Sequence, residues 1–172
     1  MGKLTFILGG ARSGKSGMAV KIARDCKGKI AFIATCQALD KEMEKRIVLH
    51  QNSRPKNWQT FEASCDPELL VKNLVDKFDL IIVDCLTLLV TNLLLKGLSE
   101  KQIERKVSLM VRELLKNKNN SVIVSNEVGL GIVPENKLAR DFRDIAGRMN
   151  QLVAQQSEEV LVMFAGLSLK LK

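Results

Sequence analysis

The sequence predicts an α/β fold with a mainly parallel central sheet, helices on both faces and a nucleotide-binding loop. Three observations support this prediction. Short apolar segments rich in β-branched residues alternate with segments of helical periodicity, as in parallel sheets. The motif G-G-A-R-S-G-K-S directly follows the first apolar segment, at residues 9–16. No repeat or break in composition divides the 172 residues, so we expect one domain over residues 1–172.

Each expected strand is a short apolar segment that ends in polar or turn-forming residues. The strands are expected at Leu4–Leu8, Ile30–Ala34, Leu80–Asp84, Val122–Ser125 and Val160–Ala165. The segments between them predict helices at Ser16–Cys26, Glu42–His50, Pro67–Phe78, Ser99–Asn117 and Asn136–Gln156. Asp66-Pro67 is a helix start signal, and Gly147 is a candidate for an interruption of the last helix. In such a sheet, site residues gather at the carboxyl ends of the strands.

The motif at residues 9–16 matches the phosphate-binding pattern G-x-x-x-x-G-K-[ST]. We expect nucleotide contacts from all its members: Gly9, Gly10, Ala11, Arg12, Ser13, Gly14, Lys15 and Ser16. Glycines let successive backbone N–H groups turn towards phosphate oxygens. Lys15 can act on the outer phosphates in catalysis, and the Ser16 hydroxyl can ligate Mg²⁺. A glycine-rich turn without a ligand would leave Lys15 and Ser16 unexplained.

Polar residues follow three of the other expected strands. Asp84 ends an apolar strand downstream of the phosphate-binding loop, where a carboxylate commonly holds Mg²⁺; its alternative role is a cap or turn residue. Ala34-Thr35 and Ser125-Asn126-Glu127 end two further strands. We expect these groups to lie near the nucleotide.

The segment Asp40–Glu62 contains the only histidine and the only tryptophan of the chain. Arg46 and His50 are four residues apart, so they share one helical face. A neutral imidazole is a competent nucleophile towards phosphorus, whereas most solitary histidines are structural. The residues alone leave both roles of His50 open.

The loop Asn126–Asn136 contains two glycines and a proline between a strand and a helix. Such a loop suits a lid or a subunit contact. Arg140, Arg143 and Asp144 follow on one helical face, with Gly147 as an expected point of close approach one turn later. We expect this region to border a substrate or a neighbouring subunit.

Composition excludes several classes of protein. The net charge is +8, but Lys and Arg are scattered among acidic residues and the chain has no tyrosine, so we expect no nucleic-acid partner. No apolar run reaches the roughly 18 residues that a membrane span needs. A strand is expected directly after the amino terminus, without a secretory signal. The spacing of Cys26, Cys36, Cys65 and Cys85 suits neither zinc nor paired thiols, and we expect reduced thiols in the cytoplasm.

The chain resembles the bifunctional adenosylcobinamide kinase / adenosylcobinamide-phosphate guanylyltransferase family of cobalamin assembly over essentially its whole length. The first matching segments are G-G-A-R-S-G-K-S at 9–16, I-A-T at 33–35 and D-x-E-M-x-x-R-I-x-x-H-x-x-x-R-P-x-x-W-x-T-x-E at 40–62. D-C-L-T and T-N-L-L follow within 84–94. The last is N-E-V-G-x-G-I-V-P-E-N-x-L-A-R-x-F-R-D-x-x-G-R-x-N-Q at 126–151. The segments at 40–62 and 126–151 are the most specific.

This resemblance implies two reactions. ATP or GTP phosphorylates the aminopropanol hydroxyl of adenosylcobinamide, and GTP then transfers GMP to that phosphate through a guanylyl-histidine, with release of pyrophosphate. His50 falls on the family's histidine, and Leu49 stands where some members have a second one. The implied nucleotide contacts beyond Gly9–Ser16 are Ala34, Thr35, Cys36, Gln51, Asn52, Ser53, Arg54, Glu62 and Asp84. The implied fold is RecA-like, and the implied assembly is a homotrimer.

Two other functions remain to be weighed against this one. The first is a simpler P-loop kinase for a small molecule, in which His50 is structural. The second is a RecA-type ATPase that depends on nucleic acid, against which the scattered charge argues.

Overall fold

The computed structural model describes residues 2–37, 55, 57–116 and 118–172. Its sheet has seven strands in the order β3-β2-β4-β5-β1-β6-β7. The strands are β1 (Leu4–Gly9), β2 (Ile30–Ala34), β3 (Gln59–Glu62), β4 (Leu80–Asp84), β5 (Asn120–Asn126), β6 (Glu159–Phe164) and β7 (Leu167–Lys170). All neighbouring strands are parallel except β6 and β7, which form an antiparallel hairpin. The five expected strands are confirmed, with ends that differ by up to two residues.

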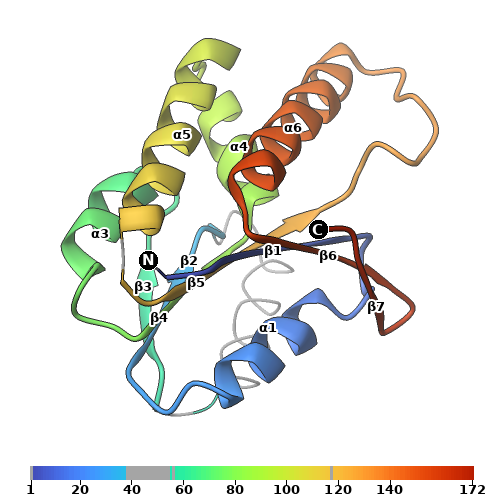
Figure 1. Ribbon diagram of the computed structural model, residues 1–172. Helices are drawn as coiled ribbons and strands as arrows, with labels where there is room; N and C mark the ends of the chain where they lie inside the picture. Colours follow the sequence, from blue (N-terminus) through green and yellow to red (C-terminus); the bar gives the residue numbers. More distant parts are fainter. Residues whose placement is uncertain (1, 38–54, 56, 117) are drawn as a thin grey trace.

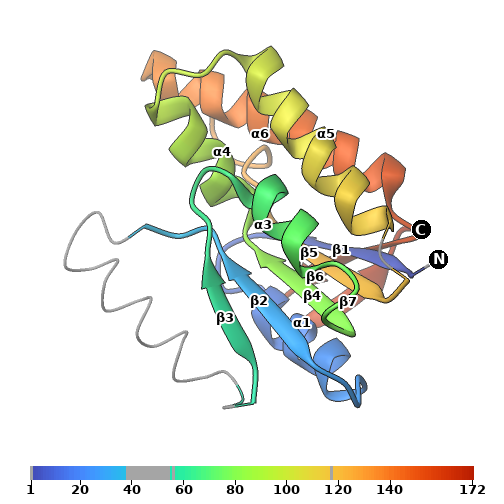
Figure 2. The same ribbon diagram turned by 90° about the vertical axis from the view of Figure 1, so that its left-hand side faces the viewer.

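Helices cover both faces of the sheet, as expected. The helices are α1 (Lys15–Arg24), α3 (Pro67–Leu74), α4 (Leu86–Leu95), α5 (Glu100–Lys116) and α6 (Lys137–Gln156). In Figure 1, α1 lies on one side of the sheet and the other labelled helices lie on the opposite side. Figure 2 gives the same arrangement from a direction at right angles. The two buried apolar clusters follow this division, because Ala19 and Ala23 of α1 belong to one and Val107 and Val153 to the other.

Three elements were not expected from the sequence. Strand β3 is exposed apart from the half-buried Phe61, and β7 is exposed throughout, so neither has the pattern of a buried strand. Helix α4 follows β4 after one residue and is apolar almost all round, with Leu89, Val90 and Leu93 buried. A helix without a polar face has no amphipathic period to detect.

Two expected helices differ in the structure. The helix expected over Pro67–Phe78 ends at Leu74, because Val75 is extended and Asp76 has a positive φ of 67°. This turn brings Phe78 against Phe61, with ring centroids 5.7 Å apart. The expected interruption at Gly147 is wrong, since α6 is continuous over 20 residues. The helix expected over Glu42–His50 lies outside the described residues.

The described part of the chain contains no helix that is both long and apolar enough to cross a membrane.

Candidate nucleotide-binding site

The phosphate-binding loop connects β1 to α1 at the carboxyl edge of the sheet. Gly9 has a φ of 154° and Gly14 a φ of 100°, which glycine adopts at low cost. A Cβ atom on Gly9 would lie 2.6 Å from the Met163 carbonyl oxygen. The loop therefore depends on glycine at these two positions.

Helix α1 begins at Lys15, directly after Gly14, and no side chain caps its amino terminus. The first N–H groups of a helix have no partner within it, and their dipoles favour an anion. The glycine geometry and this uncapped terminus together make the loop suitable for phosphate.

The ammonium group of Lys15 lies inside the loop. The residue is 8% exposed, and its Nζ donates to Gly10 O at 2.5 Å and to Ser13 Oγ at 3.4 Å. Burial lowers the pKa of Lys15, while the nearby Cys85 and Asp84 oppose this effect. The Asp84 carboxylate therefore contributes to the electrostatic environment of the Lys15 ammonium group.

Three further strands end side by side at the same edge of the sheet as the loop, on the other side of β5. Ala34 is paired with Asp84 on one side and with Glu62 on the other. The Thr35 N–H donates to Asp84 O at 3.1 Å, and the Cys85 N–H donates to Thr35 Oγ1 at 2.8 Å. The structure therefore brings together the predicted residues of β2, β3 and β4. His50 and the predicted contacts Gln51, Asn52, Ser53 and Arg54 lie outside the described residues.

Buried neutral side chains hold this edge in place, and sequence reasoning did not identify them as site residues. Asn92 Nδ2 donates to Thr35 O at 2.8 Å and to Ser64 O at 2.9 Å. Thr87 Oγ1 lies 3.2 Å from Cys85 Sγ, and burial, followed by the charge of Asp84, raises the pKa of this thiol to about 11. Thr87 and Asn92 belong to the unexpected helix α4. Their only sequence signal is a polar residue within an apolar run.

The loop that follows β5 is attached to the phosphate-binding loop at its base. Glu127 N–H donates to Gly9 O at 3.0 Å, and Arg143 Nη2 donates to Gly129 O at 2.7 Å. Arg140 Nη1 donates to the carbonyl oxygens of Pro134 and Glu135. The two arginines thus hold the loop, which projects from the body of the molecule in Figure 1.

Within the described residues Gly147 makes no close approach to another element, and an approach to a substrate or a neighbouring subunit stays a prediction. No heavy atom of these residues lies within 4 Å of the position of a Cβ atom on Gly147, apart from its own helix and chain neighbours. A helical glycine on a partly open face accounts for this.

Two further features adjoin the phosphate-binding loop. The turn of the β6–β7 hairpin packs on it, with Gly166 N–H donating to Ser13 O at 3.0 Å. A hollow of about 420 Å³ starts at Ser16 and runs along α1 past Lys21 and Arg24. Its basic lining suits an anionic ligand.

Comparisons with known proteins agree with a phosphate-binding loop at this edge of the sheet. The sequence matches the family described as cobinamide kinase / cobinamide phosphate guanyltransferase over residues 5–171. The chain belongs to this family. It is therefore a P-loop enzyme of the kinase and nucleotidyltransferase class.

Curated bacterial relatives cover nearly the whole chain. The bifunctional adenosylcobalamin biosynthesis protein CobU of Salmonella typhimurium is 38% identical over 181 residues, covering 98% of this chain and 99% of the relative. Its namesake in Escherichia coli is 36% identical with the same coverage. The protein CobP of Pseudomonas aeruginosa is 38% identical over 167 residues, covering 97% of this chain and 96% of the relative.

Solved structures of P-loop, RecA-like proteins share the fold. The RadB recombinase matches with a TM-score of 0.53 and 13% identity, over 93% of this chain and 73% of its own. An ATPase from a type III secretion system matches with a TM-score of 0.62 and 12% identity, over 99% and 58%. At such identities the likeness concerns the fold alone.

Proposed function

We propose that this protein phosphorylates the aminopropanol hydroxyl of adenosylcobinamide with ATP or GTP, and then transfers GMP from GTP to the new phosphate. The products of the second step are adenosylcobinamide-GDP and pyrophosphate. The observation that carries this proposal is the family match over residues 5–171, together with a phosphate-binding loop whose buried lysine interacts electrostatically with Asp84.

The kinase step is assigned to the loop and Asp84. Lys15 supplies positive charge at the transferring phosphate. Ser16 and Asp84 fit a Mg²⁺ ion, because a hydroxyl and a carboxylate are hard oxygen donors. Both residues come from elements that end or begin at this edge. Bound Mg²⁺ would neutralise charge on the phosphates.

The GMP-transfer step is assigned to His50, with support from the sequence and the family. Direct attack of the substrate phosphate on GTP would bring two polyanions together, whereas a neutral imidazole avoids that repulsion. The His50 nitrogen bonds to the α-phosphorus of GTP as the bond to pyrophosphate breaks. The substrate phosphate oxygen then displaces the imidazole. Arg46 and Arg54 are close in sequence to His50 and are candidates to stabilise the charge.

The decisive experiment incubates the wild-type and His50→Ala enzymes with GTP labelled at the α-phosphate. The wild-type enzyme should carry acid-labile label, and mass spectrometry should find one added GMP on the peptide that contains His50. His50→Ala should lose the adduct and GMP transfer while keeping adenosylcobinamide phosphorylation, because that step needs no imidazole nucleophile. Full GMP transfer by His50→Ala would rule out the covalent route and favour the simpler kinase with a structural His50.

We also propose a cytoplasmic homotrimer. Exposed apolar side chains in two regions support self-association: Leu130, Ile132, Val133 and Leu138 around the loop after β5, and Leu167, Leu169 and Leu171 around β7. Light scattering coupled to size exclusion should give three times the mass of the chain. A monomer at micromolar concentration would contradict the trimer without affecting the assigned reactions.

A further inference from the structure

Asn126 occupies a central position at the carboxyl edge of the sheet. It ends β5, the strand between β1, which leads into the phosphate-binding loop, and β4, which ends in Asp84. Asn126 is paired with Gly9, the first residue of the loop motif. Val122 and Val124 of the same strand pack in the cluster on the α1 side. By the alternation of side chains along a strand, the Asn126 side chain starts on that side, and at the end of the strand its amide reaches Thr87 in the first turn of α4.

Asn126 is held by hydrogen bonds from two helices. Its backbone N–H and its Nδ2 both donate to Thr87 Oγ1 of α4, at 3.1 and 3.2 Å. Its carbonyl oxygen accepts from Asn150 Nδ2 of α6 at 3.3 Å. Thr87 and Asn150 are 4% and 5% exposed. Asn150 is itself fixed, because its Oδ1 accepts from Ser125 Oγ at 2.7 Å.

These contacts fix the orientation of the Asn126 amide. Thr87 Oγ1 accepts twice, so its own proton is directed to Cys85 Sγ at 3.2 Å. The amide nitrogen therefore faces Thr87 and the oxygen faces away from it. Within the described residues Asn126 Oδ1 makes no hydrogen bond, and the residue is partly exposed.

A neutral acceptor at this place has a specific chemical use. Phosphorylation of a hydroxyl requires the attacking oxygen to be in line with the terminal phosphate, and an acceptor can orient it through its proton. An uncharged oxygen does this without adding negative charge beside a polyanion. The neighbouring carboxylate of Glu127 is engaged by the Gly129 N–H at 2.7 Å.

We infer that Asn126 Oδ1 accepts a hydrogen bond from the hydroxyl that attacks the terminal phosphate, and that Thr87 is the residue that positions Asn126. This inference rests on the proposed kinase function. In the step, the hydroxyl oxygen bonds to the terminal phosphorus while the bond from that phosphorus to the bridging oxygen breaks. The nucleoside diphosphate leaves, and the hydroxyl proton passes to solvent water. The GMP-transfer step does not use this contact, because its first nucleophile is an imidazole.

The test measures three quantities for the wild-type enzyme and its variants: kcat for adenosylcobinamide phosphorylation, the Kd for ATP, and GMP incorporation into the protein. Asn126→Ala and Thr87→Val should lower kcat about 10- to 100-fold, with the other two quantities within about twofold. Thr87→Ser should restore kcat because it keeps the hydroxyl. The double variant should be no slower than Asn126→Ala alone, since both changes remove one interaction.

Thr91→Val is the matched control. Thr91 lies one turn further along α4, and its hydroxyl donates to the Thr87 carbonyl oxygen at 3.0 Å, so its loss should leave kcat unchanged. A normal kcat in Asn126→Ala would overturn the inference and leave the proposed function standing. A parallel loss of ATP binding and GMP incorporation would also overturn it, because it indicates a structural role. Failure of the wild-type enzyme to phosphorylate adenosylcobinamide would overturn the proposed function itself.

Discussion

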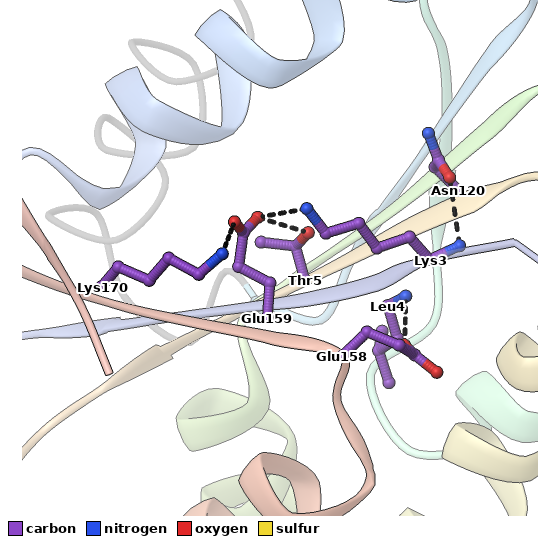
Figure 3. A network of polar contacts seen from close by, with 7 residues as sticks. All are labelled: Lys3, Leu4, Thr5, Asn120, Glu158, Glu159 and Lys170. Carbon is purple, nitrogen blue, oxygen red and sulfur yellow. Dashed lines mark hydrogen bonds and ion pairs between the residues drawn. The ribbon is translucent and has the colours of Figure 1, made fainter. Parts of the chain in front are cut away.

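The amino and carboxyl ends of the parallel strands carry polar networks of opposite character. At the amino end, shown in Figure 3, Glu159 binds Lys3 at 2.9 Å and Lys170 at 3.3 Å. The carboxylate of Glu158 accepts from the Leu4 N–H at 2.7 Å. These charges compensate one another near solvent, where Lys3 is 48% exposed.

At the carboxyl end, neutral side chains make the contacts. Asn92, Thr87 and Asn150 bind backbone and hydroxyl groups and are all buried, while Lys15 donates to neutral oxygen atoms. The protein thus neutralises charge at the amino ends of the strands, and at their carboxyl ends it presents an ammonium group to a ligand. We conclude that charge is compensated at the amino end, whereas buried neutral hydrogen bonds hold the carboxyl end in place.

The largest effect on activity should follow from removing the buried charge. Lys15→Ala should lower phosphorylation about 10²- to 10³-fold, the usual loss for one electrostatic group at a reacting phosphate or oxyanion. The fold should be retained, because a buried ammonium group already has a desolvation cost. Steady-state kinetics and circular dichroism measure the two effects. Lys72→Ala, an exposed lysine on α3, is the control, and equal rates for both variants would refute the role of Lys15.

The largest effect on stability should come from the buried hydrogen bonds of the neutral side chains Asn92, Thr87 and Asn150. Asn92→Leu keeps the side-chain size but leaves the carbonyl oxygens of Thr35 and Ser64 without their donor. We expect a loss of about 2 kcal/mol in the free energy of unfolding, because unpaired buried acceptors are costly. Urea unfolding gives the value. A loss below about 0.5 kcal/mol would mean that this network does not stiffen the site.

The ion pairs of the amino end should matter less. Glu159→Gln removes the charge that faces Lys3 and Lys170. Partly exposed pairs contribute roughly 0 to 1 kcal/mol, so we expect a loss within that range and smaller at 1 M salt. The same urea titration at two salt concentrations measures it. A loss as large as that of Asn92→Leu would reverse the comparison.

The smallest expected effect is the pH dependence of the stability difference between the wild-type protein and Glu159→Gln. Hydrogen bonding by Lys3 and then by Lys170 lowers the pKa of Glu159 against the opposing effect of burial. A lowered pKa in the folded state gives stability that is complete above the ordinary glutamate range and is lost as the pH falls through the folded value. The difference between wild type and Glu159→Gln should therefore shrink below about pH 4. Unfolding curves from pH 3 to pH 7 measure this, and a difference that grows towards low pH would contradict the assigned sign.

Local sequence patterns predicted the parts of the fold that are buried and periodic. The runs ending at Ala34 and Asp84 have one buried residue after another and form the central strands β2 and β4. Strands β3 and β7 have no such pattern because they lie at the two edges of the sheet and remain exposed. Each of the two is a strand because it forms hydrogen bonds with a neighbouring strand. The neighbour of β3 is β2, which is distant in the sequence, whereas the neighbour of β7 is β6, to which a tight turn connects it.

By itself, the sequence determined the phosphate-binding loop, because its function depends on residue types at fixed spacing within eight residues. It also determined the central strands and the family to which the chain belongs. Only the tertiary structure decided which polar residues form hydrogen bonds with the carboxyl ends of the strands. Thr87, Asn92 and Asn150 are ordinary residues in their helices, and they matter because folding places them against the ends of β2 and β5. A hydrogen bond between residues 24 to 57 positions apart leaves no local pattern, since it depends on how whole elements pack.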